Sequence, residues 1–152
     1  MSYVITLTDR THVGTTTNYK CFLPNPITIN KNSYVQIQSA FIDKDNSSTY
    51  AGAIYVIVPQ LSSAESYWLN QENNGKTGMI GCLNSFEGQG SAVNDVINFA
   101  TSMPKIPLNN SELVINELDV ELRDRENKLI TTTDISNSSI TIMITDDKQL
   151  LS

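Results

Sequence analysis

The chain has 152 residues, of which 39% are hydrophobic and 17% charged, and its formal net charge is −6. A negative chain is poorly suited to binding duplex nucleic acid, because contacts to phosphates require a basic surface. No window contains the run of about 18 apolar residues that a membrane-spanning helix needs.

Short alternating stretches separated by turn residues recur along the chain, as is typical of an all-β protein. In the first half we expect strands at 3–8, 17–23, 33–42 and 53–59, with the prolines of 24–29 interrupting them because proline cannot donate within a central ladder. In 33–42 the apolar side chains are expected to face the core and the polar ones to face away, namely Val35, Ile37 and Phe41 against Gln36 and Gln38.

The second half begins with an irregular stretch, 60–78, that contains one short expected helix around 63–69. Strands are then expected at 79–84, 95–101, 112–123 and 138–145, and the last should turn Ile140, Ile142 and Ile144 inward. No repeat or linker divides the chain, so residues 1–152 form a single expected domain, which is long enough to fold without a metal or disulfide.

A change of phase marks the strand expected at 112–123. Leu113 and Ile115 alternate with polar residues, but Leu118, Val120 and Leu122 continue the alternation one residue out of step. A strand keeps one face buried across such a slip only if an extra residue is absorbed. The sequence therefore predicts a β-bulge at Asn116–Glu117.

The acidic stretch 117–130 could hold a metal or an acid–base pair, or it could be the solvated side of a hairpin. Past the bulge, Asp119 and Glu121 should point away from the core beside Arg123, whereas Asp124 and Glu126 fall in or near a turn. A calcium-binding loop would also need a glycine at its bend, which is missing here. We therefore predict a solvated hairpin with no metal site.

Residues for catalysis are sparse. His12 is the only histidine and lies in a polar turn, and no nucleophile-elbow motif accompanies it. Cys21 and Cys82 are widely spaced and, because no secretory signal is apparent at the start of the chain, are expected to be reduced, buried thiols. With one histidine, they cannot complete a four-ligand zinc site without carboxylates. We predict no catalytic, cofactor-binding or metal-binding residue, and no enzyme activity.

Two further stretches resemble binding motifs only in part. Residues 73–78 end like a phosphate-binding loop, but position 70 is asparagine instead of glycine and no helix pattern follows. Residues 84–91 carry glycines without the strand–helix context of a dinucleotide site. Tyr67 and Trp68 could stack on a sugar, although we favour a role as anchors at a barrel end or a subunit contact.

The order of features in Pro26–Ile42, Pro107–Ile130 and Ile140–Thr145 resembles a known family. A strand follows a polar first hairpin, a proline-bounded hairpin comes late, and a short alternating strand ends the pattern. The chain is thereby similar to the single jelly-roll capsid proteins of large eukaryotic DNA viruses and virophages, especially the penton proteins. One departure is the late turn "DRENKL", which lacks the family's usual glycine.

This resemblance implies an eight-stranded antiparallel jelly roll with Greek-key connections. It also implies a structural virion protein that assembles as a homopentamer at the five-fold capsid vertex, made in the host cytoplasm and without a cofactor. Its partners would be the double jelly-roll trimers of the major capsid protein and minor cement proteins, which would offer basic surfaces to its acidic faces. Segments 43–48, 72–78 and 84–91 would be among the loops at the barrel ends.

Two other functions remain open from the sequence. A carbohydrate- or receptor-binding β-sandwich, such as a spike or fibre head, would expose Tyr67 and Trp68 at one end. A small β-fold hydrolase would need a nucleophile and base, and the sequence shows no such pair.

Overall fold

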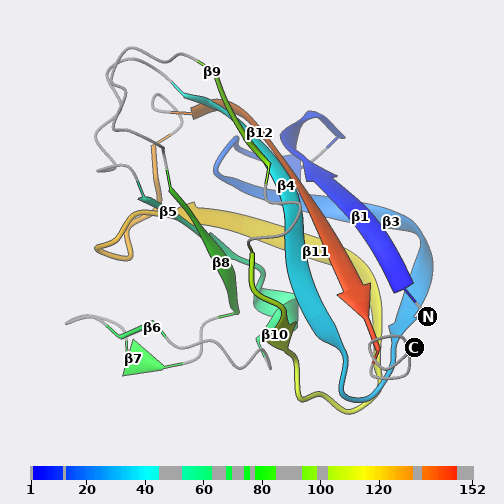
Figure 1. Ribbon diagram of the computed structural model, residues 1–152. Helices are drawn as coiled ribbons and strands as arrows, with labels where there is room; N and C mark the ends of the chain where they lie inside the picture. Colours follow the sequence, from blue (N-terminus) through cyan, green and yellow to red (C-terminus); the bar gives the residue numbers. More distant parts are fainter. Residues whose placement is uncertain are drawn as a thin grey trace.

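The computed structural model describes residues 2–11, 13–44, 53–62, 68–69, 74–75, 78–84, 94–98, 103–131 and 135–146. Two antiparallel five-stranded sheets face each other as a sandwich, and a two-stranded ribbon lies beside them (Figure 1). The all-β prediction is confirmed. In the part of the chain described, no helix is long and apolar enough to cross a bilayer.

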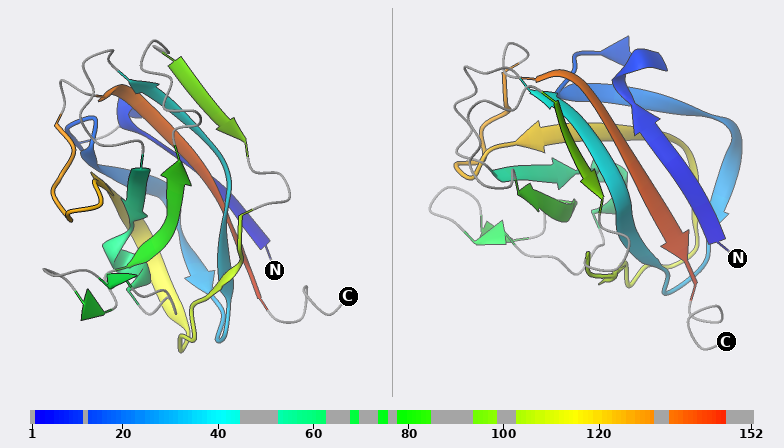
Figure 2. Two further views of the ribbon diagram at one scale, coloured as in Figure 1. Left: turned by 60° about the vertical axis from the view of Figure 1, so that its left-hand side comes forward. Right: turned by 45° about the horizontal axis from the view of Figure 1, so that its top comes forward.

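The first sheet, called sheet A, contains both the first and the last strand. Its order is β1 (Ser2–Thr8), β12 (Ile135–Thr145), β4 (Tyr34–Lys44) and β10 (Ile106–Pro107), and β9 (Asn94–Asn98) also pairs with β4. β1, β12 and β4 run side by side in all three ribbon views (Figures 1 and 2).

The second sheet, called sheet B, contains β2 (Val13–Gly14), β3 (Asn18–Ile29), β11 (Leu113–Arg123), β5 (Ala53–Ile57) and β8 (Met79–Asn84), in that order. The ribbon pairs β6 (Trp68–Leu69) with β7 (Asn74–Gly75). Two 3-10 turns complete the described elements, η1 (Asp9–Thr11) before β2 and η2 (Pro59–Leu61) after β5.

The core lies between the sheets and consists of aliphatic side chains from alternate strand positions. The largest contributions from sheet A are Leu7, Val35, Ile37, Ile42, Ile140, Ile142 and Ile144, and those from sheet B are Tyr19, Ile29, Ile54, Val56, Leu83, Leu118, Val120 and Leu122. The inward orientation predicted for Ile140, Ile142 and Ile144 is confirmed.

The predicted bulge in β11 is also confirmed, and its partner strand is the more distorted of the two. Ile115 pairs with Ile27 and Glu117 with Phe22, so four residues of β3 stand opposite the single residue Asn116. Pro24 and Pro26 lie in this unpaired stretch, where a missing N–H costs nothing. The prediction that the prolines separate two strands is wrong, because β3 continues through them to Ile29.

A second bulge, in β4, overturns the orientation predicted for Phe41. Ile142 pairs with Ile37 and Thr141 with Ser39, which leaves Gln38 as the extra residue. Beyond it, Ala40 and Ile42 are buried and Phe41 is on the outer surface. The slip reverses which side chains face the core.

The remaining strand predictions vary in accuracy. Strand 79–84 is found as predicted and 53–59 ends two residues early. Of 95–101, residues 95–98 lie in β9, Asn94–Asn98, and 99–101 lie outside the described residues. The helix expected around 63–69 is wrong for Trp68–Leu69, which are in a strand, and residues 63–67 lie outside the described residues. Most of the loops 43–48, 72–78 and 84–91 also lie outside them.

A buried polar cluster closes the end of the sandwich where β12 begins. Ser138 Oγ donates to the Thr16 carbonyl at 3.0 Å and lies 3.3 Å from the Tyr19 hydroxyl, which donates to the Leu7 carbonyl at 3.3 Å. The Ser138 amide donates to Asp9 Oδ1 at 3.3 Å. Burial raises the pKa of Tyr19 above its ordinary value, partly offset by the Ser138 hydrogen bond.

Tyr19 should make the fold sensitive to alkali. The pKa of Tyr19 is higher in the folded state than in the unfolded chain, so the neutral hydroxyl contributes fully to stability below pH 10. This contribution is lost above pH 10, where Tyr19 ionises in the unfolded chain. The loss should reach about 1.4 kcal/mol by pH 11. We expect Tyr19→Phe to be less stable than the wild type at pH 8 and the gap to narrow by that amount at pH 11, measured by urea unfolding. Parallel pH profiles would contradict the assignment.

Candidate functional site

The acidic stretch of β11 lies on the outer face of sheet B. Leu118, Val120 and Leu122 are fully buried, while the residues between them are partly exposed, as predicted. Whether this face can perform chemistry depends on what its carboxylates contact.

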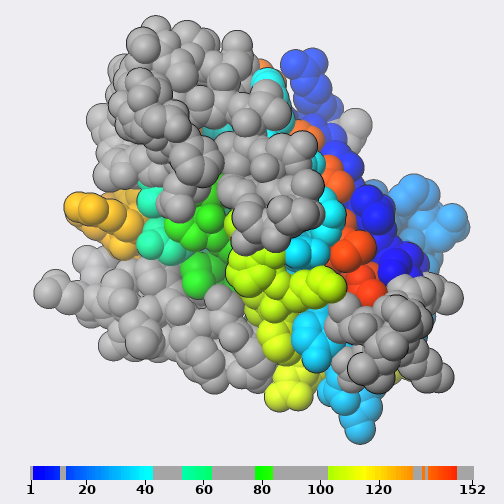
Figure 3. Space-filling model, viewed as in Figure 1, coloured from blue at the N-terminus to red at the C-terminus, as the bar shows by residue number. Residues whose placement is uncertain are grey.

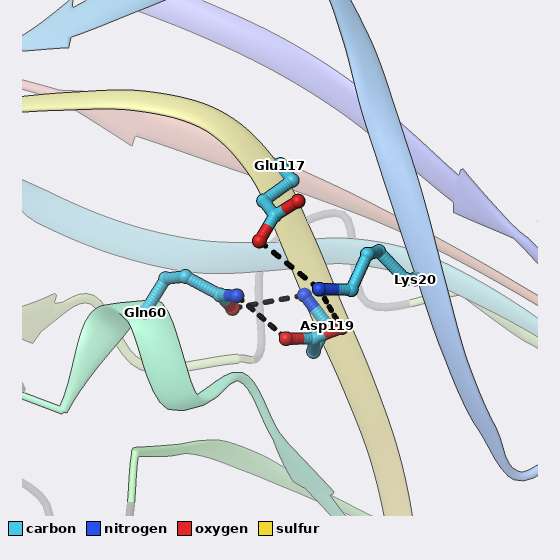
Figure 4. A network of polar contacts seen from close by, with 4 residues as sticks. All are labelled: Lys20, Gln60, Glu117 and Asp119. Carbon is cyan, nitrogen blue, oxygen red and sulfur yellow. Dashed lines mark hydrogen bonds and ion pairs between the residues drawn. The ribbon is translucent and has the colours of Figure 1, made fainter. Parts of the chain in front are cut away.

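Lys20 of β3 forms ion pairs with the first two carboxylates (Figure 4). Its Nζ lies 3.0 Å from Glu117 Oε1 and 3.7 Å from Asp119 Oδ1. The hydrogen bond to Glu117, with a smaller contribution from Asp119, raises the pKa of Lys20. The pairing follows from the register, since Lys20 and Asp119 are directly opposite one another across the two strands.

Gln60 of η2 holds Asp119 from the other side. Its Nε2 donates to Asp119 Oδ2 at 2.7 Å, and its Oε1 accepts from the Asp119 amide at 2.8 Å (Figure 4). β5 pairs with β11 only at Glu121–Arg123, so at Asp119 the side chain of Gln60 takes the place of a strand partner. The amide of Asp119 is thereby satisfied where the ladder has ended.

The later charges of the stretch are used within the hairpin. Arg123 Nη2 contacts Glu121 Oε1 at 2.6 Å, and its Nη1 donates to the Asn127 carbonyl at 2.9 Å. Asp124 Oδ1 accepts from the amides of Glu126 and Lys128 at 2.9 and 3.0 Å, which places Asp124 and Glu126 in the turn as predicted.

Asn127 explains how the turn dispenses with glycine. Its φ is +65°, in the left-handed region that glycine and asparagine tolerate best. The turn "DRENKL" therefore reaches the left-handed conformation without a glycine, because Asn127 adopts it.

These carboxylates are thus distributed over different partners instead of meeting at a common centre, since Glu117 and Asp119 share Lys20 and Glu121 pairs with Arg123. In the described part of the chain, no group of three or more His, Cys, Asp or Glu side chains is placed to hold a metal ion. The arrangement fits a solvent-facing sheet surface whose strands are held in register by ion pairs and by the side-chain amide of Gln60.

We expect Gln60→Leu to destabilise the fold by about 2 kcal/mol, because it removes one hydrogen bond to a carboxylate and leaves the Asp119 amide without its acceptor. Lys20→Met is the matched control, since an ion pair of an exposed lysine contributes little to stability. Urea unfolding of both variants would test the difference. Equal losses would mean that Gln60 is no more than another surface contact.

The other candidates from the sequence are only partly described. Trp68 lies in β6 opposite Gly75 of β7, and the structure describes its backbone alone. Tyr67 and His12 lie outside the described residues. In 73–78, Asn74–Gly75 form β7 and Gly78 adopts a φ of +79°. The Lys76–Thr77 pair that would matter in a phosphate loop lies outside the described residues.

Both cysteines are reduced thiols, Cys21 buried and Cys82 half-buried. Burial raises the pKa of each thiol, since the thiolate is poorly solvated there. A raised pKa lowers the thiolate fraction and so the nucleophilicity. Neither thiol is arranged as an activated nucleophile.

Two recesses open on the surface of the described region. The larger, of about 430 Å³, is a mainly apolar groove between β1 and β3, lined by Tyr3, Ile5, Leu7, Cys21, Phe22, Leu23 and Ile27, among others. The smaller, of about 270 Å³, is polar and lined by Asn32, Ser33, Tyr34, Pro107 and Asn109. The sequence analysis anticipated neither.

Sequence reasoning also missed Asn110, which organises the end of the sandwich opposite the Ser138 cluster. Its side chain bonds the Ser33 amide and the Asn30 carbonyl, and Asn30 Nδ2 in turn donates to Asp146 Oδ2 at 3.0 Å. The available signal was the "NN" pair at 109–110, since asparagine favours turns and Asn109 has a φ of +50°.

A comparison with models of known protein families finds no match for this chain, and a comparison with curated protein sequences finds none either.

Proposed function

We propose that the sandwich is an eight-stranded jelly roll and that the chain is a structural capsid protein, the penton of an icosahedral virion. The nested pairing of its strands is the observation that carries this proposal. The first of the eight main strands pairs with the last, the second with the second to last, and so on toward the middle of the chain. The pairs are β1–β12, β3–β11, β4–β9 and β5–β8.

Such nesting is what a jelly roll requires. In a jelly roll the two halves of the chain pair as one long antiparallel hairpin, and this hairpin is wound so that successive strand pairs belong alternately to the two sheets. Here β1–β12 and β4–β9 are in sheet A, whereas β3–β11 and β5–β8 are in sheet B. The short strands β2, β6, β7 and β10 are additions to the eight that this pairing defines.

The outer face of sheet B is consistent with a structural shell protein. The acidic stretch is engaged in ion pairs and turn hydrogen bonds, and the penton resemblance spans the strands of both sheets. In this role the chain performs no chemistry and binds no cofactor. Five copies close a ring head to tail at the vertex, surrounded by major capsid trimers and cement proteins.

The mass of the purified protein in solution tests the proposal. Light scattering should give a mass near five times the 16.8 kDa of one chain. A map of the virion should then place this chain at the five-fold vertices. A trimer with measurable glycan affinity would instead indicate a spike or fibre head and would overturn the penton assignment.

A further inference from the structure

The outer face of β1 and β12 in sheet A carries no charge, in contrast to that of β3 and β11 in sheet B. β1 and β12, with 7 and 11 residues, contain no charged residue. The charged residues of the other sheet A strands lie at one end of β4, Asp43 and Lys44, and in β9, Asp95. A solvent-exposed protein surface is ordinarily about 25–35% charged. The outer face of sheet B carries Lys20, Glu117, Asp119, Glu121 and Arg123.

Four polar side chains on this face are already hydrogen-bonded. Thr6 and Thr141, opposite each other in β1 and β12, share a hydrogen bond of 3.0 Å between their hydroxyls. Gln38 Nε2 donates to Gln36 Oε1 at 3.0 Å, and Gln36 Nε2 donates to the Met103 carbonyl at 2.6 Å. Polar groups that are satisfied within the face can be buried with little desolvation cost.

The edge of the same sheet is unprotected. β1 pairs with β12 over its whole length without a bulge, and no described strand pairs with its other side. Natural edge strands are usually defended by lysine, proline or a bulge, and "SYVITLT" has none of these. On the inner side of this edge lies the apolar groove toward β3, where Phe22 is exposed.

We propose that a second copy of this chain packs against β1, covering the uncharged outer face of β1, β12 and β4 and the adjoining groove. The charge of the chain selects this occupant. Two chains of −6 repel each other, and the repulsion is smallest where the contact involves a surface without carboxylates. Figure 3 shows β1, β12 and β4 adjoining on one side of the molecule.

Area shows why the groove belongs to the contact. Three strands about seven residues long cover roughly 24 by 14 Å, or roughly 340 Å². A stable interface buries about 800 Å² on each partner. The flat face alone is therefore too small, and β1, which borders both the face and the groove, is the centre of the contact.

This inference rests on the self-assembly in the proposed function, although not on the number five. The test compares Val4→Lys with Val114→Lys. Val4 on β1 is 68% exposed, and Val114, on the outer face of sheet B, is 70% exposed. Both substitutions reduce the net negative charge equally, so general repulsion falls in both and only local burial differs.

Sedimentation of the full chain over a range of concentrations provides the readout. We expect Val4→Lys to raise the concentration needed for half-assembly at least about ten-fold and Val114→Lys to leave it unchanged or lower. Thr6→Lys, a second exposed position on the same face, should behave as Val4→Lys does, which guards against a folding defect in one variant.

The results separate the two proposals. Unchanged assembly of Val4→Lys and Thr6→Lys, or an equal loss in Val114→Lys, would overturn the contact surface while a pentameric mass still supported the penton. If the wild type is a dimer or trimer that Val4→Lys dissociates, the proposed contact surface is supported and the penton function is contradicted. A wild-type chain that stays monomeric throughout would overturn the second-copy contact, and the virion map would then decide the penton separately.

Discussion

Asn110→Leu is expected to reduce the free energy of unfolding by about 2–3 kcal/mol, although the two side chains are similar in size. Asn110 Oδ1 accepts from the Ser33 amide at 3.1 Å, and its Nδ2 donates to the carbonyls of Asn30 and Ser111 at 3.0 and 2.7 Å. Asn110 and Ser33 are both buried. Leucine would leave the buried Ser33 amide without its acceptor at about 1–3 kcal/mol, whereas the Asn30 carbonyl keeps its hydrogen bond from the Ser33 hydroxyl at 2.7 Å.

Urea unfolding of the purified variant measures this loss. Asn25→Leu is the matched control, because Asn25 is exposed in the unpaired part of β3 and the same substitution there should change stability by about 0.5 kcal/mol or less. Since Asn110 ties the β3–β4 turn to the start of β11, the amides of residues 30–33 should also lose hydrogen-exchange protection. A loss below about 1 kcal/mol would show that water replaces the side chain.

The two bulges illustrate how far the sequence could predict the fold. The β11 bulge was predictable because firmly apolar residues on both sides, Ile115 and Leu118, fix the buried face on each side of the slip. The β4 bulge was missed because both phases of "SAFI" contain apolar residues. Only the pairing with β12 across the sheet selects Ala40 and Ile42 over Phe41.

The prediction that the prolines of 24–29 end the strand was wrong for a related reason. Proline excludes a ladder position, and that local rule held, since Pro24 and Pro26 have no partner in β11. It could not say that the strand resumes in the same sheet at Ile27. That outcome depends on β11, whose pairing residues lie far away in the sequence.

The candidate site shows the same division between local and long-range information. Alternation predicted which carboxylates face outward, and the turn residues placed Asp124 and Glu126. Their partners could not be predicted, because Lys20 lies 97 positions from Glu117 and Gln60 lies 59 positions from Asp119. The lack of charge in β1 and β12 is visible in the sequence, but only the topology unites these strands on one face.

Gly14→Ala is the second large expected effect, a loss of about 3 kcal/mol or more at an exposed position. The φ of Gly14 is +130°, a backbone conformation that costs other residues about 1–3 kcal/mol. A Cβ there would also lie 2.4 Å from the Asn18 carbonyl oxygen. That oxygen cannot retreat freely, because it accepts from the Thr15 amide at 2.8 Å in the turn that leads into β3.

Gly81→Ala provides the informative control, because burial alone would rank the two variants the other way. Gly81 is buried in β8, and a Cβ there would meet Ile37 Cδ1 at 2.6 Å and Met103 Cε at 2.9 Å. Both atoms are the ends of side chains that can rotate, so the expected cost is about 1–2 kcal/mol. Urea unfolding should find Gly14→Ala the less stable variant. The reverse order would mean that the β2–β3 turn relaxes more readily than the core, because backbone strain at Gly14 would then be smaller than the packing strain at Gly81.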